Sequence, residues 1–409
     1  MSQTYDIPAP YFFLSYPRID PLAGNPDENP DQLVETFFGD LTHAVKRHAT
    51  GGGEGVSGFY DRAIPIGSDV KQFTTRALSA AQVFVPLYSV AYVKNSWPGR
   101  ELTCFRKRVE QAGRDNPEHR FVPVLWTPLA GVQDPPGLRE SLASRVTVPD
   151  YADNGLRVLL KLRSYHNSYL SAIDRLAVQI VELAERDPIE SVEPSRVGDV
   201  AKTPSEFPAS RPLPVFNVDI IAPTSASAPP GRDPRSYGAT PAQWRPFPVQ
   251  QVSLAEHARQ LIEQFDFDVR VGAATGPVAR RPGIIMIDPA FIADKAGRDS
   301  LRAVADALPR WVLPLVVVAP DDAPTRDLAA GVLDILTKAR ALPAERSGKA
   351  AHRVNSLDDF VSAVPVLVAE AERQYFRSRD RRVLPSQGAQ RPSLRQPEGS
   401  DGAAAAADP

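Results

Sequence analysis

The sequence lacks the residues from which several common kinds of site are built. It has one cysteine, Cys104, so an intramolecular disulfide and a cysteine-ligated zinc site are both excluded. The six histidines are scattered and no two are spaced i,i+4, which leaves a metal site with little support. No Walker phosphate loop, zinc-protease motif or nucleophile elbow occurs, and no local signature favours a Ser-His-Asp triad. We therefore expect no metal and no required cofactor.

A dominant charge and a long apolar run are also missing. The formal net charge is −2, so electrostatic binding to nucleic acid or to an anionic membrane is not indicated. The longest apolar run, residues 311–319, is too short to cross a bilayer. Residues 1–10 lack the basic start and apolar stretch of a signal peptide. We expect a cytoplasmic protein without nucleic-acid or membrane partners.

What the sequence does contain is an alternation of short apolar runs with amphipathic stretches. An apolar content of 43% with 23% charged residues is typical of a globular protein with a sizeable core. Apolar strands that alternate with helices predict a parallel sheet covered on both faces. Strands are expected at residues 11–16, 57–60, 82–88, 121–126, 145–148, 216–222, 283–288 and 311–319. Helices are expected at residues 32–48, 73–81, 101–112, 164–186, 254–265, 299–308, 325–340 and 357–376.

The alternation is interrupted once, by a segment rich in Pro, Ser, Glu and Arg without periodicity. A chain of 409 residues is also too long for one ordinary core. The predicted division is a first α/β domain at residues 1–186, a linker at 187–214, a second α/β domain at 215–379 and a disordered tail at 380–409. The long loop at residues 223–248 is expected to be mobile.

The two halves resemble each other weakly. Residues 10–15 are similar in position and character to residues 214–219, and residues 120–125 are similar to residues 311–316. The order of elements between these segments also agrees, so we interpret the second half as a diverged copy of the first fold. Two unrelated parallel-sheet domains are the alternative, because buried strands look alike in any case.

One glycine-rich segment, residues 53–58, fits G-x-G-x-x-G letter by letter. A dinucleotide loop needs a strand before the motif and a helix after it, so that the phosphate meets the helix amides. Here the predicted helix comes before and the predicted strand after. We interpret the segment as a flexible connection.

The most informative stretch lies between residues 59 and 101. A polar loop, residues 61–69, follows a strand at the end where open α/β sheets place their ligands. Trp97 and Glu101 are four residues apart and share one face if the helix has already begun. A carboxylate beside an aromatic ring could bind a ribose and stabilise a cationic transition state of glycosidic cleavage. The alternative is an acid that complements the helix dipole beside an aromatic that only packs.

In their order these residues resemble the TIR (Toll/interleukin-1 receptor) domain over roughly residues 10–150. The segments that carry the resemblance are Phe13-Leu14-Ser15-Tyr16, Phe59-Tyr60-Asp61, Ser89, Tyr92, Ser96-Trp97 and Glu101-Leu102. The last four of these segments are similar to a motif of the family that ends in W-x-x-x-E-L. The layout of the whole chain is similar to the actinobacterial FxsC family of TIR-like proteins, which is associated with FxSxx-COOH peptide systems.

The resemblance implies two flavodoxin-like domains, the first TIR-like and the second a degenerate copy. Enzymatic TIR domains cleave the nicotinamide–ribose bond of NAD with the glutamate of W-x-x-x-E, so Glu101 is the expected catalytic residue and NAD the expected substrate. The residues expected to bind NAD are Phe13, Ser15, Arg18, Asp61 and Trp97. In the second domain Ser300-Leu301 falls near the place of Glu-Leu, so that copy is expected to lack catalysis.

The resemblance leaves other functions open, because many TIR domains act only as self-associating adaptors. In that case the loop at residues 61–70 is expected to contact a neighbouring copy, and the protein would be a signalling or scaffold module of the peptide-modification system. A third alternative, intermediate between enzyme and scaffold, is a pocket that binds a nucleotide without turnover. All readings imply self-association through the TIR-like domain, and peptide-system proteins are the expected further partners.

Overall fold

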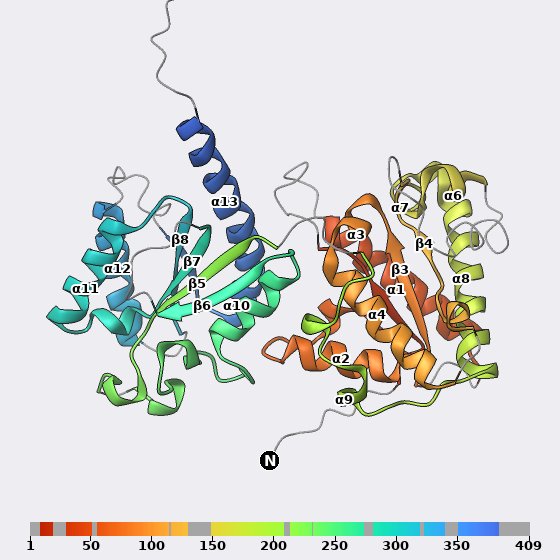
Figure 1. Ribbon diagram of the computed structural model, residues 1–409, viewed down its shortest axis with the longest axis horizontal. Helices are drawn as coiled ribbons and strands as arrows, with labels where there is room; N and C mark the ends of the chain where they lie inside the picture. Colours follow the sequence, from red (N-terminus) through yellow and green to blue (C-terminus); the bar gives the residue numbers. More distant parts are fainter. Residues whose placement is uncertain are drawn as a thin grey trace, which may run out of the picture.

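The computed structural model describes residues 9–18, 30–50, 55–113, 116–129, 149–207, 213–230, 232–273, 281–319, 323–339 and 351–383. These residues form two α/β domains, each with its own parallel sheet between layers of helices (Figure 1). The predicted fold class, two flavodoxin-like domains, is confirmed. No helix within the described ranges is long and apolar enough to cross a membrane.

The first sheet has the strand order β2-β1-β3-β4, with all pairs parallel. Its strands are β1 (Phe12–Ser15), β2 (Gly58–Phe59), β3 (Val83–Tyr88) and β4 (Val124–Leu125). Side chains of β1 alternate between the two faces: Phe12 and Leu14 pack on one side and Phe13 on the other. The strand predicted at residues 145–148 lies outside the described residues.

Helices cover both faces of this sheet. The helices on the face of Phe12 are α1 (Pro30–His48) and α8 (His166–Arg186), and those on the face of Phe13 are α2 (Val70–Ala80) and α4 (Ser96–Gln111). Shorter helices complete the domain: α3 (Val90–Lys94), α6 (Pro149–Asn154), α7 (Leu156–Lys161) and α9 (Pro194–Val197). Helix α1 ends before the glycine-rich segment and strand β2 begins at Gly58, which agrees with the context that argues against a phosphate loop.

The second sheet has the order β6-β5-β7-β8-β9, again all parallel. Its strands are β5 (Val215–Ile221), β6 (Asp268–Ala273), β7 (Gly283–Ile287), β8 (Val312–Val317) and β9 (His352–Val354). One face is covered by α10 (Leu254–Glu263) and α13 (Leu357–Val383), and the other by α11 (Lys295–Ala307) and α12 (Ala323–Ala339). Strands β6 and β9 were not predicted.

Both sheets place their first four strands in the order 2-1-3-4, which agrees with the interpretation of the second half as a diverged copy. The register supports the equivalence of individual residues. Ser15 pairs with Pro86 across β1 and β3, and Asp219 pairs with Ile285 across β5 and β7. When the same register is followed across to β4 and β8, Ser15 and Asp219 fall at equivalent positions. The similarity of residues 10–15 to residues 214–219 gives the same equivalence.

The segment predicted as a linker is structured over much of its length. It contains α9 and a 3₁₀ turn at Val200–Lys202, and Val197 and Val200 are buried with the residues of α2 and α4. The buried Arg108 of α4 donates hydrogen bonds to the carbonyl oxygens of Leu78 and Glu190, which ties this segment to the end of α2. The start of the segment therefore packs as part of the first domain. At the other end of the chain α13 continues to Val383, and residues 384–409 lie outside the described residues.

Candidate active site

The predicted catalytic residue lies at the carboxyl ends of β1 and β3, on the first turns of α4. Asn95 caps this helix by accepting a hydrogen bond from the backbone N–H of Trp97 at 2.9 Å. The helix has therefore begun before Trp97, as the sequence argument required. Trp97 and Glu101 lie one turn apart, and the indole Nε1 of Trp97 donates to Oε1 of Glu101 at 2.8 Å.

A chain of hydroxyl groups satisfies the other oxygen of Glu101. Ser15 at the end of β1 donates from Oγ to Oε2 of Glu101 at 2.6 Å, and the hydroxyl of Tyr92 donates to Ser15 Oγ at 3.0 Å. Tyr92 is held in turn by Ser89, whose Oγ accepts from the Tyr92 backbone N–H and caps α3. Glu101 is 5% exposed and Ser15 1%, so the acid is removed from solvent. Tyr92, which sequence reasoning did not include among the site residues, completes the network.

Burial controls the charge of this acid. Desolvation raises the pKa of Glu101 to about 8, and the nearby negative charge of Asp61 acts in the same direction. The hydrogen bonds from Ser15 and Trp97 and the charge of Arg18 oppose the shift without cancelling it. Glu101 is therefore mostly protonated at neutral pH. An acid whose pKa is moved this far by burial, with specific polar partners, is typical of functional sites.

Two further predicted residues meet at the edge of the site. Asp61 accepts hydrogen bonds from the hydroxyl of Tyr16 and from Nη2 of Arg18, each at 2.6 Å. The ion pair is largely shielded, since each side chain is 14% exposed. Arg18 and Asp61 therefore come together as expected, but they contact each other rather than Glu101.

Phe13 lies among aromatic side chains beneath the site. It shares the face of β1 with Ser15 but lies one pleat deeper, and its ring stacks against Phe59 and Phe84 with centroids 5.1 and 5.5 Å away. The side chain is 1% exposed. Trp97, at 4%, is also enclosed. In this structure both rings pack in the core, and Trp97 presents only its N–H to the acid.

Residues of the second domain reach the rim of the site, and sequence reasoning missed them. Gln264 accepts a hydrogen bond from Nε of Arg18 at 3.1 Å, and Asp266 accepts from the backbone N–H of Ser96 at 2.9 Å. The positive φ of Asp266, 62°, is a conformation that non-glycine residues rarely adopt. No local pattern marks either residue, because their role depends on how the domains pack together.

No group of three or more His, Cys, Asp and Glu side chains within the described ranges could hold a metal ion. Comparisons with protein-family models, with curated proteins and with solved structures find no match for this chain. The geometry around Glu101 therefore carries the functional argument.

Proposed function

We propose that the first domain is a TIR-like NAD nucleosidase in which Glu101 is the key carboxylate. One observation carries the proposal: Glu101 is a buried acid with a strongly raised pKa, at the end of the sheet where α/β proteins bind ligands, held between Ser15 and Trp97. The proposal places the protein in the cytoplasm, where a lone thiol such as Cys104 stays reduced.

In this proposal NAD binds at the carboxyl ends of β1 and β3, and Glu101 hydrogen-bonds a hydroxyl of the nicotinamide ribose. The bond from the ribose C1′ to the nicotinamide nitrogen breaks, and its electron pair leaves with neutral nicotinamide. Ionised Glu101 stabilises the positive charge that develops on the ribose. Water adds to C1′ and releases one proton, so the products are nicotinamide, ADP-ribose and a proton.

The raised pKa of Glu101 makes the reaction pH-dependent. With a pKa of about 8, roughly a tenth of the molecules have an ionised Glu101 at pH 7. We expect the rate of nicotinamide release to rise about tenfold between pH 6 and pH 7 and to level off above pH 8. A flat profile over this range would mean that the charge of Glu101 takes no part.

The direct test compares wild type with Glu101→Gln at high protein concentration and follows nicotinamide release. The substitution keeps the shape of the side chain but removes its charge, so we expect the wild-type rate to be lost. Glu110→Gln is the matched control, because Glu110 lies on the same helix and is exposed. Equal rates for wild type and Glu101→Gln would reject the nucleosidase.

A non-catalytic signalling or scaffold module of an FxSxx-COOH peptide system is the second candidate. The observation that favours it is the enclosure of Glu101 and Trp97, together with an exposed apolar side chain, Ile66 at 46%, on the loop of residues 61–69. This candidate predicts that self-association, measured by sedimentation, survives Glu101→Gln and is lost in Ile66→Asp. Association that is unaffected by Ile66→Asp would count against it.

A further inference from the structure

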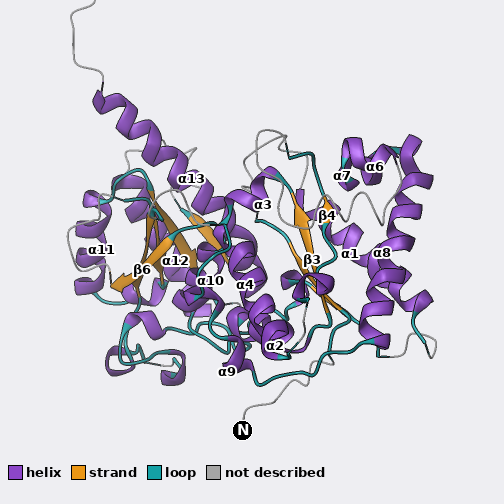
Figure 2. Ribbon diagram, turned by 45° about the vertical axis from the view of Figure 1, so that its right-hand side comes forward, coloured by secondary structure: helices purple, strands orange, loops and turns teal. Residues whose placement is uncertain are grey.

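The second domain contacts the loops around the candidate active site of the first. Helix α10 packs against α2, and the turn that follows α10, residues 264–266, reaches α4 (Figures 1 and 2). The contacts fall on three segments of the first domain: Arg18 after β1, residues 67–71 after β2, and Asn95 with Ser96 after β3. These are the loops that follow the carboxyl ends of the three strands around Glu101.

The turn after α10 provides a cap for the helix that carries Glu101. Both carboxylate oxygens of Asp266 accept from the backbone N–H of Ser96, at 2.9 and 3.0 Å, and Asp266 also accepts from the Ser96 hydroxyl. The first amides of a helix have no partner within the helix and must be satisfied from outside. Here the partner belongs to the other domain. The backbone carbonyl of Gln264 also accepts from the side chain of Asn95 at 3.2 Å.

A second helix is capped in the same way. Gln260 on α10 accepts from the backbone N–H of Val70, the first residue of α2, at 3.0 Å, and donates to Asp69 at 2.9 Å. Nearby, the backbone N–H of Gln251 donates to the carbonyl of Gly67 at 2.8 Å. A Cβ on Gly67 would come within 2.4 Å of the Val249 carbonyl oxygen, so the loop is tightly covered here.

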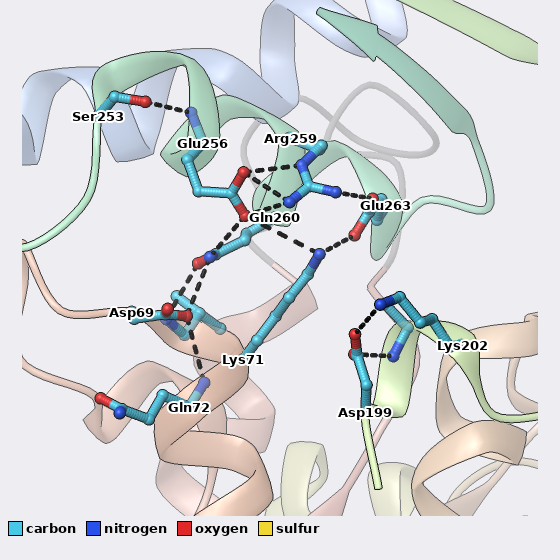
Figure 3. A network of polar contacts seen from close by, with 12 residues as sticks. Asp69, Lys71, Gln72, Asp199, Lys202, Ser253, Glu256, Arg259, Gln260 and Glu263 are labelled. Carbon is cyan, nitrogen blue, oxygen red and sulfur yellow. Dashed lines mark hydrogen bonds and ion pairs between the residues drawn. The ribbon is translucent and has the colours of Figure 1, made fainter. Parts of the chain in front are cut away.

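An ion-pair network holds the two helices together (Figure 3). Lys71 of α2 points toward α10, with Nζ 2.8 Å from Glu263 and 3.9 Å from Glu256. Arg259 of α10 pairs with both acids, at 2.6 Å to Glu256 and 3.6 Å to Glu263. The network lines an open cavity of about 620 Å³ between the domains, so these contacts are polar and reach solvent. Polar, partly solvated contacts between domains are the kind that can separate.

We infer that the second domain is a clamp that holds the Glu101 site closed, and that NAD enters only when the α10 face leaves the first domain. Glu101 and Trp97 are at most 5% exposed in the clamped state, and Arg18 is held at the rim by both Gln264 and Asp61. The segments around the acid are therefore held by residues of the second domain. The inference deepens the proposed function and rests on it for the identity of the ligand.

The test is a charge-swap cycle at the ion-pair network in the full chain. Lys71→Glu and Glu263→Lys should each open the clamp, because each places like charges against each other, and the double variant should close it again. Lys202→Glu is the matched control, since Lys202 lines the same cavity, is 85% exposed, and within the described residues pairs only with Asp199 of its own segment.

Three measurements distinguish movement of the second domain from catalysis. The backbone amides of Val70 and Ser96 are protected by second-domain acceptors, so their hydrogen exchange should quicken about tenfold in each single variant. Labelling of Glu101 by a carbodiimide and an amine should quicken by a similar factor, and so should nicotinamide release. The thiol of Cys104, buried in the first domain, should stay unreactive and show that the fold is intact.

Each outcome is decisive. Faster exchange and faster Glu101 labelling in the single variants, both reversed in the double variant, support the clamp. A parallel rise in nicotinamide release supports its control of the enzyme. Exchange that is unchanged in both single variants overturns the clamp. Faster exchange without faster Glu101 labelling also overturns it, because the site would then not be covered. If labelling follows the swap and no variant releases nicotinamide, the clamp stands and the nucleosidase fails.

Discussion

The two domains close the carboxyl ends of their sheets in different ways. In the first domain the acid beside the sheet, Glu101, accepts hydrogen bonds from the neutral side chains of Ser15 and Trp97, and Asp266 of the other domain caps the helix that carries it. In the second domain the acid at the end of β7, Asp288, is fully buried and is held by Arg232 at 3.0 Å and by the hydroxyl of Tyr237 at 2.7 Å. Both partners come from the long loop of residues 223–248.

In the proposed clamp, the cover of the first site belongs to another domain and can separate from it. The second domain covers its sheet with its own loop, which three short 3₁₀ turns and the Asp288 contacts hold in place, so we expect no ligand there. The expectation of a mobile loop at residues 223–248 therefore has no support in its contacts. In the first domain, the described segments that follow β1 and β3 are contacted by residues of the second domain. Ser300, the sixth residue of α11 as Glu101 is of α4, is exposed, so the two copies also differ at the position of the proposed catalytic acid.

The largest expected effect concerns the loop that covers the sheet of the second domain. Arg232→Met should lower the free energy of unfolding by about 3 kcal/mol, because it leaves the carboxylate of Asp288 buried without its cation. Denaturant unfolding of the two proteins at one pH measures the loss. Arg302→Met is the control, since Arg302 and its partner Asp299 are both more than half exposed and should contribute less than about 0.5 kcal/mol. A loss below about 1 kcal/mol for Arg232→Met would mean that the loop is held by other contacts.

The next effect comes from proton binding in the first domain. Glu101 has a pKa of about 8 when folded and an ordinary value of 4.5 when unfolded, so the folded state binds an extra proton between these values. Its stabilising contribution is full below pH 4.5 and is lost as the pH rises through 8. We expect Glu101→Gln to flatten this dependence and to be more stable than wild type at pH 7, by about 3 kcal/mol. Unfolding free energies measured from pH 5 to pH 9 would contradict this if the two curves ran parallel.

Asp219, which occupies the position equivalent to Ser15 in the second domain, should titrate in a lower pH range than Glu101. Burial raises the pKa of Asp219 to about 6 from an ordinary value of 3.8. The stability that this protonation adds is full below pH 3.8 and is lost as the pH rises through 6. Asp219→Asn should therefore remove pH dependence of about 1–2 kcal/mol between pH 4 and pH 6, and leave the dependence near pH 8 unchanged. A change near pH 8 in this variant would show that the two sites are coupled.

The sequence predicts what depends on local pattern and misses what depends on docking. Strands β3 and β8 are entirely apolar, so their ends were predicted within two residues. Strand β6 was missed because it lies at a sheet edge and carries charged Asp268 and Arg270, which weaken the apolar signal, and β9 has only three residues.

The residues of the site show the same difference between local pattern and domain docking. The contact of Trp97 with Glu101 follows from their i,i+4 spacing, and the place of Ser15 follows from the resemblance of the first strand. Gln264 and Asp266 lie 169 and 170 residues along the chain from Asn95 and Ser96, and Gln264 lies 246 residues from Arg18, so no spacing connects them. The expected contact of Phe13 with the ligand stays a prediction, and the sequence alone does not show how deep along β1 the site begins.

The smallest expected effect compares two helix caps. Asp266 caps α4 from the other domain, whereas Asp294 caps α11 within its own domain by accepting from the Gly297 backbone N–H at 2.7 Å. Removing either carboxylate, in Asp266→Ala or Asp294→Ala, should lower the free energy of unfolding by about 1 kcal/mol. Only Asp266→Ala should also quicken hydrogen exchange at Ser96, because that amide then loses its acceptor whenever the domains are docked. Equal exchange at Ser96 in both variants would mean that the cap is satisfied locally, and that the second domain covers α4 without stabilising it.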